Sequence, residues 1–261
     1  MALLTGTTQL SARTIFVGDK HSVAECTTGG GVINRTLIKG LKLTFGIALS
    51  GHDLFVANED SGVIGKYTRA GRVINARLIS GLDGPAGIAI SGNRLFVANY
   101  RADTIGEYTT SGRTINASLI SGLAGPNGLA VSGNDLYVVN FGSGTIGEYT
   151  LSGRAVNVAL LSALPGPEGI AVKGDHIFVA SDGAGTIGKY TTTGQVVNAA
   201  LISGLRDPFG LAIAGNKIYI ADERSAGQIQ EYTTAGKIIN SALATGLNYP
   251  GFIAVSGSHR P

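Results

Sequence analysis

Short apolar stretches alternate with glycine-rich turns along the whole chain. Between Arg113 and Thr150 the apolar stretches read RTINASLI, GLAVSG, NDLYVVN and GTIGEYT. Their alternation and their β-branched residues predict strands, and the Ser-Gly-Asn and Thr-Ser-Gly clusters between them predict turns. No window keeps apolar residues at the i, i+3 and i+4 spacing of an amphipathic helix. The pattern therefore predicts an all-β protein.

The strand pattern is a repeat. A Tyr-Thr-x-x-Gly motif recurs every 41 or 42 residues, at Tyr67–Gly71, Tyr108–Gly112, Tyr149–Gly153, Tyr190–Gly194 and Tyr232–Gly236, with Cys26–Gly30 as the divergent first copy. Four-stranded units of this length are typical of β-propeller blades. The sequence therefore predicts a single domain over residues 1–261, a six-bladed β-propeller of four-stranded antiparallel blades with about 41 residues per repeat.

The two chain ends are expected to close the ring. The first unit begins with its second, third and fourth strands, at Thr14–Phe16, Ser22–Glu25 and Val32–Ile38, and the chain ends with an extra first strand at Gly251–Gly257. An open array would leave two sheet edges unpaired. We therefore expect the C-terminal strand to complete the N-terminal blade. Thr7–Ala12 competes for the same innermost place.

Two repeated polar slots are interpreted as parts of the scaffold. An asparagine occupies one position of each outer strand: Asn34, Asn75, Asn116, Asn157, Asn198 and Asn240. We predict that its side chain hydrogen-bonds between adjacent blades. The tyrosine of the repeated motif is predicted to pack in the core, and Cys26, which takes its place in the first copy, is predicted to be a buried packing residue.

One face of the propeller is expected to carry function. In antiparallel blades, the Pro-x-Gly turns before the first strands and the loops between the second and third strands share a face, and these loops differ among the copies while the frame repeats. Such diversity is expected where loops on a rigid scaffold recognise a partner, and equally where loops are unconstrained. The predicted ligand-binding residues are Phe45, Glu59, Tyr100, Arg101, Phe141, Asp182, Phe209 and Arg224.

Catalytic motifs are missing from the sequence. It contains no G-x-S-x-G, HExxH, CxxC or P-loop pattern, which removes the usual support for serine hydrolases, zincins and nucleotide hydrolases. Of the four histidines, only His21 is placed on the loop-rich face, and it is the one candidate base. Cys26 is the only cysteine, so no internal disulfide forms.

Charge and hydropathy exclude further partners. The net charge is +3, from 20 basic and 17 acidic residues without a basic run, which gives no case for nucleic acid. No apolar run approaches the roughly 20 residues of a membrane helix, so membrane insertion is not expected. We expect a monomer, cytoplasmic if Met1 is native and exported if a signal was removed.

The phrase PxGIAVxGxxLYVAN followed by glycine resembles the NHL-type repeat over nearly the whole chain. The third strand departs from it, because TIGEY stands where NHL repeats often carry an arginine. Members of that group mostly serve as binding modules, so the resemblance implies a propeller that binds or scaffolds a protein, peptide or glycan. A mainly structural ring is a further alternative.

The repeated phrase changes at one slot, which holds Asn127 and Glu168 in neighbouring copies. An amide oxygen and a carboxylate are ligands for Ca²⁺ or Mg²⁺, which need several oxygens. Asp19, Asp182 or Asp222 would have to complete the set. This pair predicts a metal site at the mouth of the central channel; the alternative is that Glu168 is a solvated carboxylate at the channel mouth and Asn127 a turn-forming residue before glycine.

The same pair resembles the gluconolactonase and senescence-marker-protein (regucalcin) propellers. The resemblance implies a catalytic divalent metal held by an Asn, an acidic residue and a Glu of the first blade. Asn127 and Glu168 match the first two, but Gly251 and Thr7 occupy the candidate places of the third, and Ala86 stands where a further Asn can occur. The alternative function is therefore a metal-dependent, lactonase-like hydrolase with His21 or an acidic loop residue as proton acceptor.

Overall fold

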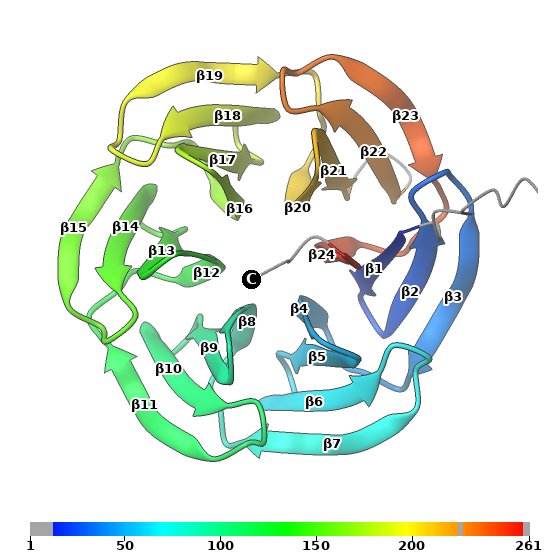
Figure 1. Ribbon diagram of the computed structural model, residues 1–261, viewed down its shortest axis with the longest axis vertical. Coiled ribbons are helices and arrows are strands. Elements are labelled where there is room, and N and C mark those ends of the chain that lie inside the picture. The colour runs from blue at the N-terminus through cyan, green and yellow to red at the C-terminus, as the bar shows by residue number, and fades with distance from the viewer. Residues whose placement is uncertain (1–12, 224–226, 258–261) are drawn as a thin grey trace, which may run out of the picture.

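The computed structural model describes residues 13–223 and 227–257 as six four-stranded antiparallel sheets arranged around a common axis (Figure 1). Blade 1 consists of β24 (Pro250–Val255), β1 (Thr14–Asp19), β2 (Ser22–Thr27) and β3 (Val32–Lys39), blade 2 of β4 (Thr44–Ser50), β5 (Asp53–Asn58), β6 (Val63–Thr68) and β7 (Val73–Ser80), and blade 3 of β8 (Pro85–Ser91), β9 (Arg94–Asn99), β10 (Thr104–Thr109) and β11 (Thr114–Ile120). Blade 4 consists of β12 (Pro126–Ser132), β13 (Asp135–Asn140), β14 (Thr145–Thr150) and β15 (Ala155–Leu161), blade 5 of β16 (Pro167–Lys173), β17 (His176–Ser181), β18 (Thr186–Thr191) and β19 (Val196–Ile202), and blade 6 of β20 (Pro208–Ala214), β21 (Lys217–Asp222), β22 (Gln228–Thr233) and β23 (Ile238–Ala244). The predicted all-β six-bladed propeller is confirmed.

The C-terminal strand closes the ring, as expected. β24 pairs antiparallel with β1, with Val17 opposite Ile253, and takes the innermost place of blade 1. The backbone N–H of Ser256 donates to the carbonyl of Thr14 at 2.8 Å, and the N–H of Thr14 donates to the Ser256 hydroxyl. The competing segment, residues 7–12, lies outside the described residues. Blade 1 is therefore held by strands from both ends of the chain.

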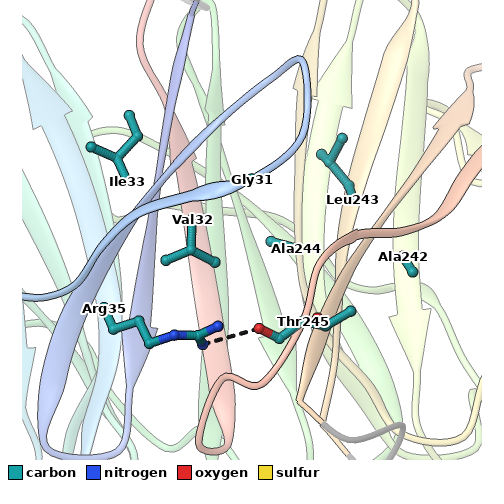
Figure 2. A pocket seen from close by; sticks show the side chains of 8 residues that line it. All are labelled: Gly31, Val32, Ile33, Arg35, Ala242, Leu243, Ala244 and Thr245. Atoms are coloured by element: carbon teal, nitrogen blue, oxygen red, sulfur yellow. Dashed lines mark hydrogen bonds between the residues drawn. The ribbon is translucent and has the colours of Figure 1, made fainter.

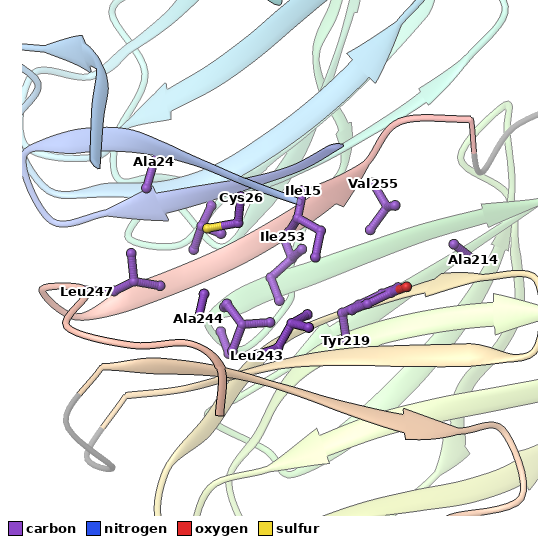
Figure 3. Close-up of a cluster of buried hydrophobic side chains, with 13 residues drawn as sticks. Ile15, Ala24, Cys26, Ala214, Tyr219, Leu243, Ala244, Leu247, Ile253 and Val255 are labelled. Atoms are coloured by element: carbon purple, nitrogen blue, oxygen red, sulfur yellow. The ribbon is translucent and has the colours of Figure 1, made fainter. Parts of the chain in front are cut away.

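Each hydrophobic core lies between two neighbouring blades. Figure 3 shows the core between blades 6 and 1, where Ile15 and Ile253 of blade 1 pack near Tyr219 and Leu243 of blade 6. All four side chains are at least nine-tenths buried, and each such burial contributes about 1.5–3 kcal/mol. Because neighbours share a core, the blades support one another around the ring.

The repeated tyrosine packs against the strand that carries it. Tyr108 is 3% exposed, and its ring lies over Gly106, where a Cβ would come within 2.7 Å of the ring. The buried Cys26 replaces this tyrosine in blade 1, and Ala24 there replaces the glycine. In blades 2 to 5 the tyrosine ring lies over this glycine, whereas in blade 6 Gln230 takes its place and its Oε1 accepts a hydrogen bond from the Tyr232 hydroxyl at 2.6 Å. The predicted packing roles of the tyrosine and of Cys26 are confirmed.

The prediction that the repeated asparagines tie adjacent blades is wrong. Asn75 is exposed, and its Oδ1 accepts a hydrogen bond from the backbone N–H of Arg77 in its own strand at 3.0 Å. The register between β6 and β7 shifts on both sides of this residue. The asparagine therefore stabilises a β-bulge in the outermost strand, and equivalent bonds occur in the other five blades.

The two sets of variable connections share one face, which we call the loop face. It comprises the inner turns, which lead into the innermost strands, and the loops that follow the second strands. The backbone N–H of Tyr100 donates to Gly84 O at 2.8 Å, and that of Phe141 donates to Gly125 O at 3.0 Å. These bonds join a loop to the inner turn of the same blade.

No helix long and apolar enough to span a membrane occurs in the described part of the chain.

Candidate functional site

Six equivalent residues, which we call the axial ring, gather near the axis of the propeller on the loop face. Each is the second residue of an innermost strand: Gly251, Phe45, Ala86, Asn127, Glu168 and Phe209 in blades 1 to 6. In blades 2 to 6 the pairing register shifts just after this position, as between Pro126 and Leu129 of blade 4. A β-bulge redirects side chains. Residues at this position contact residues of other blades, as Asn127 does Glu168 and Phe45 does Phe209.

Asn127 and Glu168 come together as the sequence predicts. The Asn127 amide Nδ2 donates a hydrogen bond to Glu168 Oε2, and the two residues are only 6% and 7% exposed. Gly128 lets the strands approach, because a Cβ there would lie 2.5 Å from the Glu168 carbonyl oxygen. The pair is a buried polar contact between blades 4 and 5.

Burial raises the pKa of the Glu168 carboxyl from 4.5 to about 8. The negative charges of Asp182, Asp207 and, to a smaller extent, Glu223 add to the rise, whereas the hydrogen bond from Asn127 opposes it. Glu168 is therefore largely protonated at pH 7, and a protonated carboxyl can donate a hydrogen bond as well as accept one.

Two of the predicted metal ligands are used by the scaffold. Asp19 Oδ1 accepts the backbone N–H of Asn248 at 2.7 Å. Asp222 is fully buried, and its carboxylate accepts the N–H of Asp207 at 3.1 Å and the Gln230 amide at 2.9 Å. Both aspartates end a second strand and fix the inner turn of their own blade.

The last residue of the second strand, which is Asp19 in blade 1 and Asp222 in blade 6, is polar in the other blades too. In blade 2 it is Asn58, whose Oδ1 accepts the N–H of Lys42 at 2.7 Å. In blade 5 the residue equivalent to Lys42 is Pro165, which has no N–H to donate. The acceptor slot there is Ser181 rather than Asn or Asp. In blades 3 and 4 the same position holds Asn99 and Asn140, whose Nδ2 groups donate to the Thr104 and Thr145 hydroxyls instead.

The donor set around Asn127 and Glu168 does not complete a metal site. No group of three His, Cys, Asp or Glu side chains able to hold a metal ion occurs among residues 13–223 and 227–257. Asp19 and Asp222 bind backbone N–H groups of inner turns, and Asn127 donates through Nδ2 to the Glu168 carboxyl group with which it was expected to bind a cation. The residues of the described part of the chain therefore do not fit a divalent metal here, and the metal site stays a prediction.

Aromatic residues occupy the opposite side of the axial ring. Phe45 and Phe209 stack with their centroids 5.2 Å apart, and Phe252 meets Phe209 edge-on at the same distance. Blade 1 lies between the blades that carry the stacked rings, and Gly251 contributes no side chain that would separate them. Phe45 and Phe209, predicted as ligand-binding residues, therefore pack against each other.

Blade 3 carries a group of predicted binding residues that reaches both neighbouring blades. Arg101 Nη2 lies 2.7 Å from Glu59 Oε1 of blade 2, and the Tyr100 ring lies 6.4 Å from the Phe141 ring of blade 4. Arg101 and Tyr100 remain 47% (side chain) and 36% exposed. We call these four residues the blade 3 platform.

Backbone contacts fix the platform in place. Asp103 Oδ1 accepts the N–H of Gly125 at 2.7 Å, and its carbonyl accepts the N–H of Leu123 at 3.2 Å, so the β9–β10 loop is joined to the inner turn of blade 4. Asp103 adopts a left-handed backbone conformation with φ of 55°, which aspartate tolerates better than most residues. The side chains of Tyr100 and Arg101 are therefore presented by a rigid loop.

The other predicted residues lie apart from the platform. Asp182, in the β17–β18 loop, is half-buried and acts on Glu168 through its charge. His21 is exposed in the β1–β2 turn of blade 1, across the ring from Asn127. Arg224 lies outside the described residues.

Three residues of the loop face were missed by sequence reasoning. Asp207 and Glu223 act on the Glu168 carboxyl, and Phe252 joins the aromatic cluster. Phe252 takes the place of the glycine in the repeated Pro-x-Gly phrase, which was a visible departure. No local pattern marks the two acids, because their effect depends on neighbouring blades.

Residues 16–232 match the model of the virginiamycin B lyase family. The chain belongs to this family. No curated protein matches it. The family match and the solved structures agree with the expected NHL-type, six-bladed propeller architecture.

The solved structures share the propeller fold at low sequence identity. A chain of a nidogen/laminin complex is 16% identical, covers 95% of this chain and 100% of its own length, and has a TM-score of 0.83. A catalytically inactive virginiamycin B lyase from Staphylococcus aureus with quinupristin is 17% identical, covers 95% and 94%, and has a TM-score of 0.68. A streptogramin B lyase is 16% identical, covers 92% and 76%, and has a TM-score of 0.65.

Proposed function

We propose that this member of the virginiamycin B lyase family is a binding propeller that takes a protein or peptide partner on the blade 3 platform. The observation that carries the proposal is the exposed Tyr100 and Arg101 pair, each joined to a different neighbouring blade. The platform therefore spans three blades and presents one surface, although its residues come from separate repeats.

The chemistry of the platform suits a protein partner. Tyr and Arg are the residue types enriched in interface hot spots, because each combines a large contact area with hydrogen-bonding groups. The ion pair to Glu59 and the ring contact with Phe141 hold both side chains before binding. Such preorganisation reduces the entropy lost on association.

The observed geometry supports binding more than lyase chemistry. A base or acid must lie close to the group that it deprotonates or protonates, and His21 lies on the blade opposite the one that carries Asn127. Glu168 is 93% buried and hydrogen-bonded to Asn127. We therefore expect no conversion of quinupristin by the purified protein; turnover that Glu168→Gln abolishes would replace the proposal.

A random linear peptide library displayed on phage tests the binding proposal. Peptides selected on the immobilised protein should bind it, and Arg101→Glu should abolish most of that binding because it reverses the charge beside Glu59. His52 is exposed in the β4–β5 turn on the opposite face, and His52→Ala serves as the control. Peptides that bind both variants equally well, or a library from which none is enriched, would overturn the proposal.

A further inference from the structure

A groove of about 400 Å³ lies on the outer rim where blades 6 and 1 meet, away from the loop face (Figure 2). It is lined by Gly31, Val32, Ile33, Arg35, Ala242, Leu243, Ala244 and Thr245. It lies between β3 and β23, its lining surface is more polar than apolar, and Figure 2 shows the Arg35 guanidinium pointing from β3 toward Thr245. The volume falls within the range typical of sites for small molecules.

The groove follows from small residues at repeated slots. Blade 1 has Cys26 at the position of the motif tyrosine. Blade 6 has Ala244 near the end of its outer strand, at a position where the other blades have a buried Ile or Leu. Gly31 takes the place of a basic residue or glutamine at the start of the outer strand. Side-chain volume is therefore missing on both sides of this junction.

Arg35 is the one large side chain that enters the groove. The equivalent slots of the other blades hold Ala76, Ala117, Val158, Ala199 and Ser241. Arg35 Nη1 donates to the carbonyls of Thr245 at 3.0 Å and Gly246 at 2.6 Å. Its Nε and Nη2 groups donate to no residue in the described part of the chain. These N–H groups form a planar fork suited to a carboxylate.

The charge around the groove favours an anion. The six outer strands, β3, β7, β11, β15, β19 and β23, contain no Asp or Glu, whereas Arg35, Lys39 and Arg77 lie on them. Asp19, the acid on which the Arg35 charge acts, already accepts the N–H of Asn248. A ligand carboxylate would therefore enter a field that is positive on balance.

We propose that this groove binds a small aliphatic carboxylate. The carboxylate accepts hydrogen bonds from the Arg35 guanidinium, and the aliphatic tail contacts Val32, Ile33 and Leu243. Binding is reversible and involves no covalent step. The proposal does not depend on the function of the loop face, because the groove lies on the outer rim.

Titration with octanoate, followed by calorimetry and by amide chemical shifts, tests the proposal. We expect saturable binding with a Kd of about 1 mM or tighter, with shifts centred on β3 and β23. Arg35→Ala, which installs the residue found at this slot in blades 2, 3 and 5, should weaken binding at least about tenfold. Octanol, which has the tail without the charge, should bind as weakly to the native protein as octanoate does to that variant.

The neighbouring groove provides a matched control. It lies between β3 and β7, has a volume of about 310 Å³, and is lined by Tyr67 and Arg77 among others. Arg77→Ala should leave octanoate binding unchanged. The double variant Ala24→Gly, Cys26→Tyr restores the repeated tyrosine beside the groove between β3 and β23 and should reduce octanoate binding even if Arg35→Ala fails to fold.

Several results would overturn the proposal. These are a native protein that octanoate does not saturate, equal affinity in Arg35→Ala, or equal affinity for octanol. Binding of a peptide with a free C-terminal leucine, in the absence of octanoate binding, would assign the groove to a protein C-terminus and overturn the small-ligand proposal.

Discussion

The Asn127 amide donates to the Glu168 carboxyl across the junction of blades 4 and 5, at identical positions of their innermost strands. The same position holds Phe, Ala or Gly in the other blades. Removing either partner leaves a buried polar group without its hydrogen bond, which costs about 1–3 kcal/mol. The pair therefore stabilises this junction and gives Glu168 an environment unlike that of a surface carboxylate.

The raised pKa of Glu168 predicts a pH-dependent stability. The folded protein keeps this proton up to a pKa of about 8, whereas the unfolded chain loses it near 4.5. The associated stability is fully present below pH 4.5 and is lost as the pH rises through about 8. Thermal melting between pH 6 and 8.5 should show a fall in Tm that Glu168→Gln reduces.

The acidic neighbours of Glu168 provide the control for this measurement. Asp182→Asn removes the largest charge that raises the pKa of Glu168, so the fall in Tm should move to lower pH. An unchanged Tm profile in both variants would show that Glu168 does not hold its proton in the folded state.

Addition of Ca²⁺ or Mg²⁺ at about 1 mM should leave Tm unchanged. Bound metal raises Tm only when the folded protein supplies enough ligands. Asp19 and Asp222 are held by backbone N–H groups. Calorimetric titration with each ion checks the result. Heat of binding that Glu168→Gln removes would establish the metal site and favour the hydrolase alternative.

Gly106→Ala should destabilise the protein by about 1–3 kcal/mol, because the new Cβ would lie 2.7 Å from the Tyr108 ring. Blade 1 indicates the compensating change, since it combines Ala24 with Cys26. Adding Tyr108→Cys to Gly106→Ala should therefore cost less than the sum of the two single changes in urea unfolding. Strict additivity would contradict the steric account.

Removal of β24 should prevent closure of the ring. A chain that ends at Tyr249 loses Ile253 and Val255, both buried between blades 6 and 1, and thereby roughly 3–6 kcal/mol of hydrophobic stabilisation. It also leaves the inner edge of β1 unpaired. We expect a non-cooperative thermal transition and aggregation; a transition like that of the full chain would show that another segment closes blade 1.

The fold could be predicted because every blade repeats the same local information. The Tyr-Thr-x-x-Gly spacing and the alternating strands determine the blade, and the extra strand at the C-terminus indicates the closure. The role of Asn75 could not be predicted, because a repeated asparagine is expected in the sequence both when its side chain hydrogen-bonds to Arg77 at a bulge and when it hydrogen-bonds to the next blade. Only the register of the paired strands separates the two.

The sequence predicted where the candidate site lies, but not most of the contacts within it. One altered slot identified Asn127 and Glu168, and repeat geometry brought them to adjacent blades. The stacking of Phe45 on Phe209 depends on the small Gly251 between their blades. Such a contact joins the second blade to the sixth, and no local sequence pattern reports it.

The binding proposal is tested most directly by comparing two tyrosines of the loop face. Tyr100 belongs to the blade 3 platform, whereas Tyr249 is 56% exposed in the inner turn of blade 1 beside Lys20. For peptides selected on the native protein, calorimetry should show that Tyr100→Ala raises Kd by about tenfold or more and that Tyr249→Ala leaves it within about twofold of the native value. Equal losses in both variants, or no loss in Tyr100→Ala, would contradict a binding site on the platform.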